Sequence, residues 1–141
     1  MTRPEIDALL ARHRAAFDQR DAAALAATHT DDGTFESPAA GLVRGRKAIA
    51  GVYAYWIASF PDIDFTWSEP IVDGDRLALF WQFRGTAAGK FFGDVKPGTK
   101  VRFAGAGDYR VSAGGIVSVT HVFDFTGALV NAGVLKIKPA T

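Results

Sequence analysis

The chain has 141 residues, of which 48% are hydrophobic and 22% charged, a composition typical of globular proteins with one hydrophobic core. The net charge of +1 argues against a nucleic-acid partner, and the absence of cysteine excludes disulfides and thiolate chemistry. No apolar run reaches the roughly 20 residues of a membrane span and no signal-peptide pattern is present, so no membrane partner and a cytoplasmic location are expected. We expect residues 1–141 to form a single domain.

The first sixty residues carry three helical patterns. Residues 2–5, Thr-Arg-Pro-Glu, combine a cap, a first-turn proline and a capping box, which predicts a helix start. A short helix is expected over 22–28, and a third over 46–60, where Pro61 ends it. The inward faces of the first and third helices are predicted to carry Ile6, Leu9, Leu10, His13, Phe17, Ile49, Val52, Tyr53, Trp56 and Phe60.

The rest of the chain alternates apolar and polar residues with period two, which indicates strands. After a short strand over 34–37 that contains Phe35, strands are expected over 63–67, 76–84, 101–110 and 116–125, with a hairpin turn at Asp73-Gly74. The side chains expected on their inner faces are Ile63, Phe65, Trp67, Leu77, Leu79, Trp81, Phe83, Val101, Phe103, Gly105, Gly107, Tyr109, Val117, Val119, His121 and Phe123. Helices followed by a meandering sheet indicate an α+β fold.

Two features of the strand region have two interpretations each. Gly105 and Gly107 on an inner face indicate either a bend in a curved sheet or the wall of a cavity. Phe91-Phe92, in the connection over 87–100, indicates either ordinary packing or a lid over a pocket. The eleven Phe, three Trp and three Tyr make a cavity lined by rings plausible.

Four segments carry a resemblance to a known family: "RGRKAI" at 44–49, "ASFPDIDF" at 58–65, "GKFFG" at 89–93 and "GGIVSVTHVFDFTGALVNAG" at 114–133. With the element order, they make the chain similar to the SnoaL-like polyketide cyclases of the nuclear transport factor 2-like superfamily. The resemblance implies a cone-shaped barrel, in which a strongly curved, mainly antiparallel sheet packs on three helices and encloses an apolar pocket.

The carboxylates that the resemblance leads one to expect are replaced. In SnoaL-like cyclases the acid/base is an Asp on the last strand, two residues after a His; these positions are His121 and Val119 here. Limonene-epoxide hydrolases also have Asp at the position of His121. In ketosteroid isomerases the oxyanion-hole positions correspond to His13 and Gly107, and the base, before a proline, corresponds to Ser37. Ketosteroid isomerisation and that type of epoxide hydrolysis are therefore not assigned.

His121 and His13 remain as the candidate catalytic pair, because imidazole exchanges protons near neutral pH and both residues point inward by periodicity. The alternative is that each is a core residue bonded to a Tyr or a backbone carbonyl. The expected substrate-binding residues are Phe17, Phe35, Tyr53, Trp56, Trp81, Phe83, Gly107, Tyr109 and Phe123. His29 is expected to end the second helix, and the scatter of the three histidines predicts no metal site.

Two functions are compatible with this pattern. The first is a cofactor-free enzyme that cyclises, isomerises or dehydrates a hydrophobic carbonyl or polyketide-type compound, with His121 as general acid/base. The second is a non-catalytic protein that binds a hydrophobic metabolite, for which fused-ring polyketides or terpenoids are candidates. The resemblance also implies a homodimer through the outer sheet face, where the apolar or small side chains are Phe80, Ala104, Ala106 and Val122. Asp108 is expected on that face in a charge network with Arg102, Arg110 and Arg84.

Overall fold

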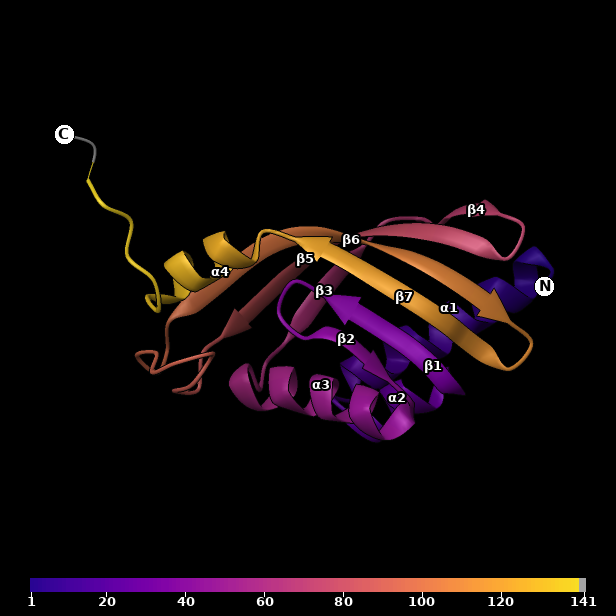
Figure 1. Cartoon of the computed structure of the whole chain (residues 1–141), viewed down its shortest axis with the longest axis horizontal. Coiled ribbons are helices and arrows are strands. Elements are labelled where there is room, and N and C mark those ends of the chain that lie inside the picture. Colours follow the sequence, from indigo (N-terminus) through magenta and orange to yellow (C-terminus); the bar gives the residue numbers. More distant parts are fainter. Residues whose placement is uncertain (140–141) are drawn as a thin grey trace.

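The computed structural model describes residues 1–139, which form four helices and seven strands in an α+β arrangement (Figure 1). The helices are α1 (Arg3–Asp18), α2 (Ala22–Ala27), α3 (Arg46–Ser59) and α4 (Phe125–Ala132). The strands are β1 (His29–Ser37), β2 (Gly41–Arg44), β3 (Asp64–Trp67), β4 (Ile71–Asp73), β5 (Arg76–Thr86), β6 (Lys100–Ser112) and β7 (Gly115–Phe123).

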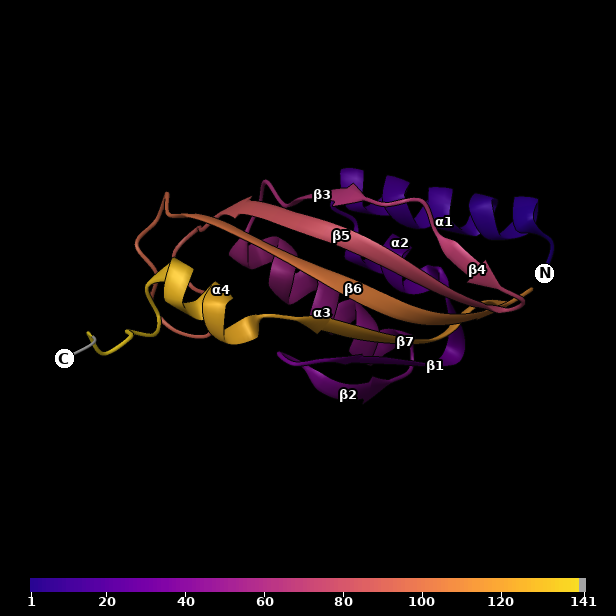
Figure 2. The same ribbon diagram turned by 90° about the horizontal axis from the view of Figure 1, so that it is seen from above.

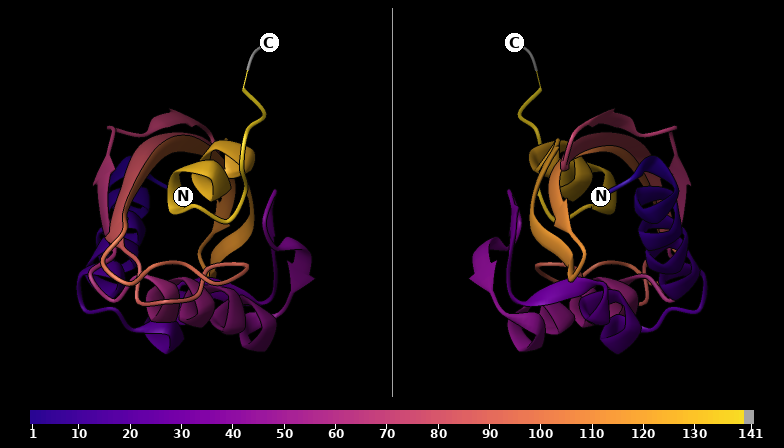
Figure 3. Two further views of the ribbon diagram at one scale, coloured as in Figure 1. Left: turned by 90° about the vertical axis from the view of Figure 1, so that its left-hand side faces the viewer. Right: turned by 90° about the vertical axis from the view of Figure 1, so that its right-hand side faces the viewer.

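All seven strands belong to one mixed sheet, in the order β2-β1-β7-β6-β5-β3, with β4 paired to the end of β5. The pairs are antiparallel except β1 with β7, which run parallel. Seen from above, β5 and β6 run side by side along the length of the molecule (Figure 2). Viewed end-on, the sheet arches over the interior, with α2 and α3 beneath it and α1 along one side (Figure 3). Within residues 1–139 the sheet does not close, so the expected barrel is instead an open, curved sheet completed by helices.

The predicted helix boundaries follow from local chemistry that the structure retains. Thr2 accepts a hydrogen bond from the backbone N–H of Glu5 at 3.4 Å, and the Glu5 carboxylate accepts one from the Thr2 N–H at 2.6 Å. This reciprocal capping box satisfies donors that the first helical turn leaves free. At the other end of the helical region, α3 stops one residue before Phe60, and Pro61 follows.

Two elements differ from the sequence-based expectations. Strand β1 begins at His29, five residues earlier than predicted, and an irregular register between His29 and Thr34 carries it through the polar residues Asp31 and Asp32. A fourth helix, α4, follows the last strand, whereas three helices were expected. It begins where Asp124 accepts a hydrogen bond from the Gly127 N–H at 2.8 Å, and it ends at Gly133 in the left-handed conformation.

Two smaller differences concern side-chain direction. Val117 was expected on the inner face but is exposed, because the register of β6 and β7 shifts next to Val111 and Ile116 takes the buried position instead. Phe91 is completely buried in the core, so packing is the correct interpretation for that ring, while its neighbour Phe92 is 41% exposed.

Two groups of buried side chains make up the core. One lies between α1, α2, α3 and the ends of β5, β6 and β7 near Leu77 and Val111. The other is mostly aromatic and lies beneath α4, around Phe60, Phe83 and Phe91. The pocket described next lies where these two groups meet, since residues of both line it.

Candidate functional site

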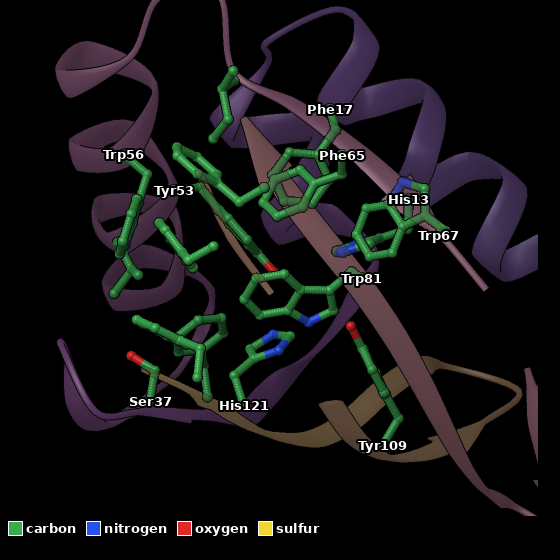
Figure 4. Close-up of a pocket in the computed structure, with 16 residues that line it drawn as sticks. His13, Phe17, Ser37, Tyr53, Trp56, Phe65, Trp67, Trp81, Tyr109 and His121 are labelled. Atoms are coloured by element: carbon green, nitrogen blue, oxygen red, sulfur yellow. The ribbon is translucent and has the colours of Figure 1, made fainter. Parts of the chain in front are cut away.

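An apolar pocket opens between the concave face of the sheet and helices α1 and α3 (Figure 4). Its lining residues are His13, Phe17, Phe35, Ser37, Val52, Tyr53, Trp56, Ile63, Phe65, Trp67, Trp81, Phe83, Phe103, Tyr109, His121 and Phe123. The space open to the centres of water molecules is about 60 Å³. At about 10–15 Å³ for each water and about 30 Å³ of liquid volume per molecule, this space suits a ligand of roughly 150 Å³, which is one or two rings.

Both candidate catalytic histidines line the pocket, as do all the predicted substrate-binding residues except Gly107. Among the described residues, five inward side chains that were not predicted to bind substrate line it as well: Val52, Ile63, Phe65, Trp67 and Phe103. Their inward periodicity was visible in the sequence, but periodicity does not separate a cavity wall from filled core. Ser37, at the position before Pro38, is the sixth addition; its hydroxyl accepts a hydrogen bond from the Ala40 N–H at 3.0 Å.

Gly105 and Gly107 on β6 form the floor on which three of the lining rings rest. A Cβ atom on Gly105 would lie 2.5 Å from the Trp81 indole. A Cβ atom on Gly107 would lie 2.5 Å from Cε2 of Tyr109 and 3.0 Å from Nδ1 of His121. Gly107 is therefore covered by these two rings and supports the site from below, where direct substrate contact had been predicted.

Three polar atoms around this floor are buried without a hydrogen-bond partner within residues 1–139: Nε1 of Trp81, the hydroxyl of Tyr109 and Nδ1 of His121. The His121 ring lies between the other two, with ring centroids 5.8 Å from Trp81 and 5.7 Å from Tyr109. Figure 4 shows the polar ends of the three side chains converging inside the pocket. Buried polar groups in native proteins are nearly always bonded, so three unpaired atoms in one cavity indicate a site for a polar ligand atom.

His13, by contrast, is tied to the protein. Its Nδ1 lies 2.8 Å from the hydroxyl of Thr28, and that hydroxyl donates its only proton to the carbonyl oxygen of Leu25 at 2.6 Å. The Thr28 oxygen must therefore accept a proton from Nδ1 of His13, which leaves the lone pair on Nε2. This bond fixes both the tautomer and the orientation of the ring.

His29 is the polar residue that sequence reasoning misplaced. It was expected at the end of the second helix, but it is the first residue of β1 and is completely buried. Its Nε2 lies 2.9 Å from the hydroxyl of Tyr53, a pocket residue. His29 was misplaced because β1 extends through two aspartates, and a polar stretch of sequence does not indicate a strand.

The sequence profile of the SnoaL-like polyketide cyclase family matches residues 7–131. The chain belongs to this family. Membership of this family supports a general role for this SnoaL-like protein as a small-molecule cyclase or isomerase. The comparison with curated proteins finds no match.

Solved structures share the SnoaL-like fold over nearly the whole chain. AclR from Streptomyces galilaeus, a proposed hydroxylase, is 24% identical, with a TM-score of 0.81 over 98% of this chain and 91% of AclR. IdmH from Streptomyces antibioticus, a proposed polyketide cyclase, is 27% identical, with a TM-score of 0.75 over 90% of this chain and 97% of IdmH. TsrD from Streptomyces laurentii is 19% identical, with a TM-score of 0.80 over 96% and 99% of the two chains.

Burial keeps the three histidines of this SnoaL-like protein neutral at physiological pH. Desolvation, followed by the positive charge that His29 would carry, lowers the pKa of His121 to about 4, against a smaller raising contribution from the backbone of Ala106. Desolvation, followed by the charges of the other two histidines and Arg14, lowers the pKa of His13 to about 3. For His29 the pKa is lowered to about 4 by burial and by Arg46. Burial raises the pKa of both Tyr53 and Tyr109, so both phenols keep their protons.

No charged residue among those described lines the pocket, but the guanidinium of Arg14 lies 5.8 Å from the ring centroid of the lining residue Trp67. Asp108 is exposed on the outer face, where Arg76 binds it through two hydrogen bonds of 2.9 and 2.8 Å. The expected partner Arg84 instead pairs with Asp64, because the register places Arg84 opposite Arg102. Within residues 1–139 no cluster of three His, Cys, Asp or Glu side chains could hold a metal ion, and no helix is long and apolar enough to cross a membrane.

Proposed function

We propose that this protein is a cofactor-free enzyme that acts on a hydrophobic ketone, with His121 as the general acid/base for enolisation. The enolate then serves cyclisation, isomerisation or dehydration. The observation that carries the proposal is the unpaired, buried Nδ1 of His121 in an aromatic pocket, at the position where the family resemblance implies an acid/base.

The proposed chemistry begins with neutral imidazole. Because burial lowers the pKa of His121 to about 4, its ring is unprotonated at neutral pH and acts first as a base. The imidazole ring of His121 takes the proton from the carbon next to the ketone, the C–H electron pair forms the enolate double bond, and the oxygen takes the negative charge. The resulting imidazolium and enolate stabilise each other, since their attraction is strong in a medium of low dielectric.

The protonated ring then acts as the acid. It returns its proton to another carbon in an isomerisation, to the new alkoxide in an aldol cyclisation, or to a departing hydroxyl in a dehydration. The size of the cavity favours substrates of one or two rings. A fused three- or four-ring polyketide would need side chains such as Trp56 to move.

Enolisation can be tested without knowledge of the natural product. Small cyclic ketones such as 1-indanone and 2-tetralone, incubated with the protein in D₂O, should take up deuterium next to the carbonyl, as measured by NMR. His121→Phe should keep the fold, because aromatic rings surround this position, and should slow the exchange by roughly 10²-fold or more. The matched control is Thr120→Ala, a neighbouring residue on the outer face, which should exchange at the wild-type rate.

The second candidate, a binding protein for a hydrophobic metabolite, is favoured by the bonded state of His13 and His29, which leaves the pocket almost wholly apolar. It predicts that ketones raise the melting temperature of the protein with no deuterium uptake above the buffer rate. The same outcome from a panel of ketones that bind would remove the catalytic proposal. Undiminished exchange in His121→Phe would remove the role of His121.

A further inference from the structure

The pocket contains two hydrogen-bond donors that neither the proposed proton transfer nor the protein itself uses. The indole N–H of Trp81 is a donor only, and the side chain is 6% exposed. The hydroxyl of Tyr109 is attached to a side chain that is 1% exposed. Neither atom has a partner within residues 1–139. A buried donor without a partner is unfavourable for the folded state, so each of them calls for a ligand or a water molecule.

The side chains that carry the two donors both pack on strand β6. The Trp81 ring rests on Gly105 and the Tyr109 ring rests on Gly107, two residues further along the same strand. Residues two apart on a strand are separated by about 7 Å. Both side chains extend from the sheet into the pocket, and their polar ends converge there beside His121 (Figure 4).

We propose that Trp81 and Tyr109 form a two-donor site for the oxygen of a neutral ketone and of the enolate made from it. A carbonyl oxygen is an acceptor with two lone pairs, so it can satisfy both donors at once. Among the described lining residues there is no lysine or arginine, so a buried carboxylate or phosphate would have no cation in contact with it, which is strongly unfavourable. This inference rests on the proposed function and names the part of the substrate that the pocket recognises.

The same geometry assigns the two donors a role in the reaction. Negative charge develops on the oxygen as His121 removes the proton, and hydrogen bonds to a charged oxygen are stronger than those to a neutral one. Fixed donors in a buried, apolar pocket therefore stabilise the enolate more than the ketone. Because burial raises the pKa of Tyr109, its hydroxyl remains a donor through this step.

The test compares 1-indanone with indane, which has the same two rings without the carbonyl group. The infrared carbonyl band of bound, ¹³C-labelled 1-indanone should lie at lower frequency than the band of the same ketone in an apolar solvent. In Tyr109→Phe the shift should be reduced and the preference for indanone over indane should fall about fivefold, the effect of one hydrogen bond. Tyr55→Phe is the matched control, because its hydroxyl lies outside the pocket and accepts a bond from the Phe92 N–H.

Trp81 is tested by a separate signal. The protein has three tryptophans, so the ¹H–¹⁵N spectrum has three indole peaks, and Trp81→Phe identifies the one from Trp81. That peak should move downfield when indanone binds and should move less when indane binds. If both ligands bind equally well, or the carbonyl band is the same in wild type and Tyr109→Phe, the two donors hold water or nothing, and the inference is wrong.

Stability separates this role from a structural one. The Tyr109 hydroxyl contacts no protein partner, so Tyr109→Phe should unfold at the same denaturant concentration as wild type or a higher one. Tyr53→Phe, which removes the bond to His29, should unfold at a lower concentration. A clear loss of stability in Tyr109→Phe would overturn the inference. A carbonyl shift without deuterium exchange would keep the donor site and remove the proposed enolisation; exchange without a shift would do the reverse.

Discussion

At the level of single residues, the three histidines are buried in three different ways. His13 donates to Thr28, His29 is bonded to Tyr53, and Nδ1 of His121 has no partner within residues 1–139. Nδ1 of His29 is also buried without a partner, but His29 does not line the pocket, so His121 is the histidine that brings an unpaired, buried nitrogen to the site. Sequence periodicity predicted that His13 and His121 point inward, but it could not distinguish a bonded ring from an unbonded one, because the partner Thr28 lies on another element.

The free energy of unfolding should therefore fall as the pH drops from about 6.5, where histidine titrates in the unfolded chain, toward 4. Burial lowers the pKa of His13 to about 3 and of His29 and His121 to about 4, whereas in the unfolded chain all three titrate near 6.5. Between these values the unfolded state binds more protons, by about three near pH 5, so the free energy of unfolding rises with pH and is fully regained above about pH 6.5.

Urea unfolding between pH 7 and pH 5 measures this effect before most carboxylates titrate. The expected loss is several kcal/mol over that range. His121→Phe should reduce the slope by about one proton, because phenylalanine does not titrate. A free energy of unfolding that stays constant from pH 7 to pH 5 would mean that the histidines are solvated, and would contradict their burial.

At the level of elements, strand β6 determines the shape of the site. Glycine normally weakens a strand, yet Gly105 and Gly107 occupy inner-face positions where side chains would collide with Trp81, Tyr109 and His121. The sequence allowed a bend or a cavity wall here. The structure adds a third possibility, a floor beneath rings that line the pocket. Two of these rings, Trp81 and His121, belong to the neighbouring strands β5 and β7, which the sequence of β6 does not name.

Gly107→Ala should therefore disturb the site. The new Cβ would lie 2.5 Å from Tyr109 and 3.0 Å from Nδ1 of His121, so both rings must shift. We expect a loss of about 1–3 kcal/mol in the free energy of unfolding, together with loss of ketone binding. Urea titration and the indanone titration measure the two effects.

Gly51→Ala is the matched control for that substitution. Gly51 is an exposed residue of α3, and apart from its chain neighbours and the backbone of its own helix, no described atom lies within 4 Å of the position of its Cβ. Alanine there should stabilise the protein by about 0.5–1 kcal/mol, because glycine is unfavourable in helices. If Gly107→Ala were as stable as Gly51→Ala and bound indanone normally, the floor would be more adaptable than its close contacts indicate.

The strongly periodic elements were the predictable ones. The alternation in β5 placed Leu77, Leu79, Trp81 and Phe83 correctly on the buried face, and the capping box located the start of α1. The irregular parts were not predictable: the register between β1 and β7 is interrupted in the polar stretch around Asp31, and Val117 faces outward at a register shift. Both depend on pairing between distant strands, which local patterns do not encode.

At the level of the whole molecule, curvature gives the sheet two different faces. The concave face and the helices enclose the pocket, while the convex face is open to solvent. On that outer face, Phe80 is opposite Ala106 and Ala106 is opposite Val122, so the three form a continuous apolar row across β5, β6 and β7. Phe80 is 56% exposed and Val122 60% exposed, and exposed Ala104 extends the row. An apolar row of this kind on a solvent-facing sheet favours an interaction with another surface.

We therefore expect a homodimer in which two copies of this row face each other. A two-fold dimer uses the same patch twice, and stable interfaces bury about 1,200–2,000 Å² in total, an area that needs most of the convex face. Phe80→Asp would place a carboxylate at the centre of that interface without a partner, so it should shift the protein to monomer by at least tenfold in the dissociation constant.

Sedimentation velocity at micromolar concentration measures the shift. The matched control is Leu42→Asp, which puts the same charge on an equally exposed apolar residue of β2, at the opposite end of the strand order from β5. Leu42→Asp should remain dimeric while Phe80→Asp dissociates. If wild type sediments as a monomer, the row does not mediate self-association. If both variants dissociate alike, the interface lies elsewhere, and the convex face must be apolar for another reason.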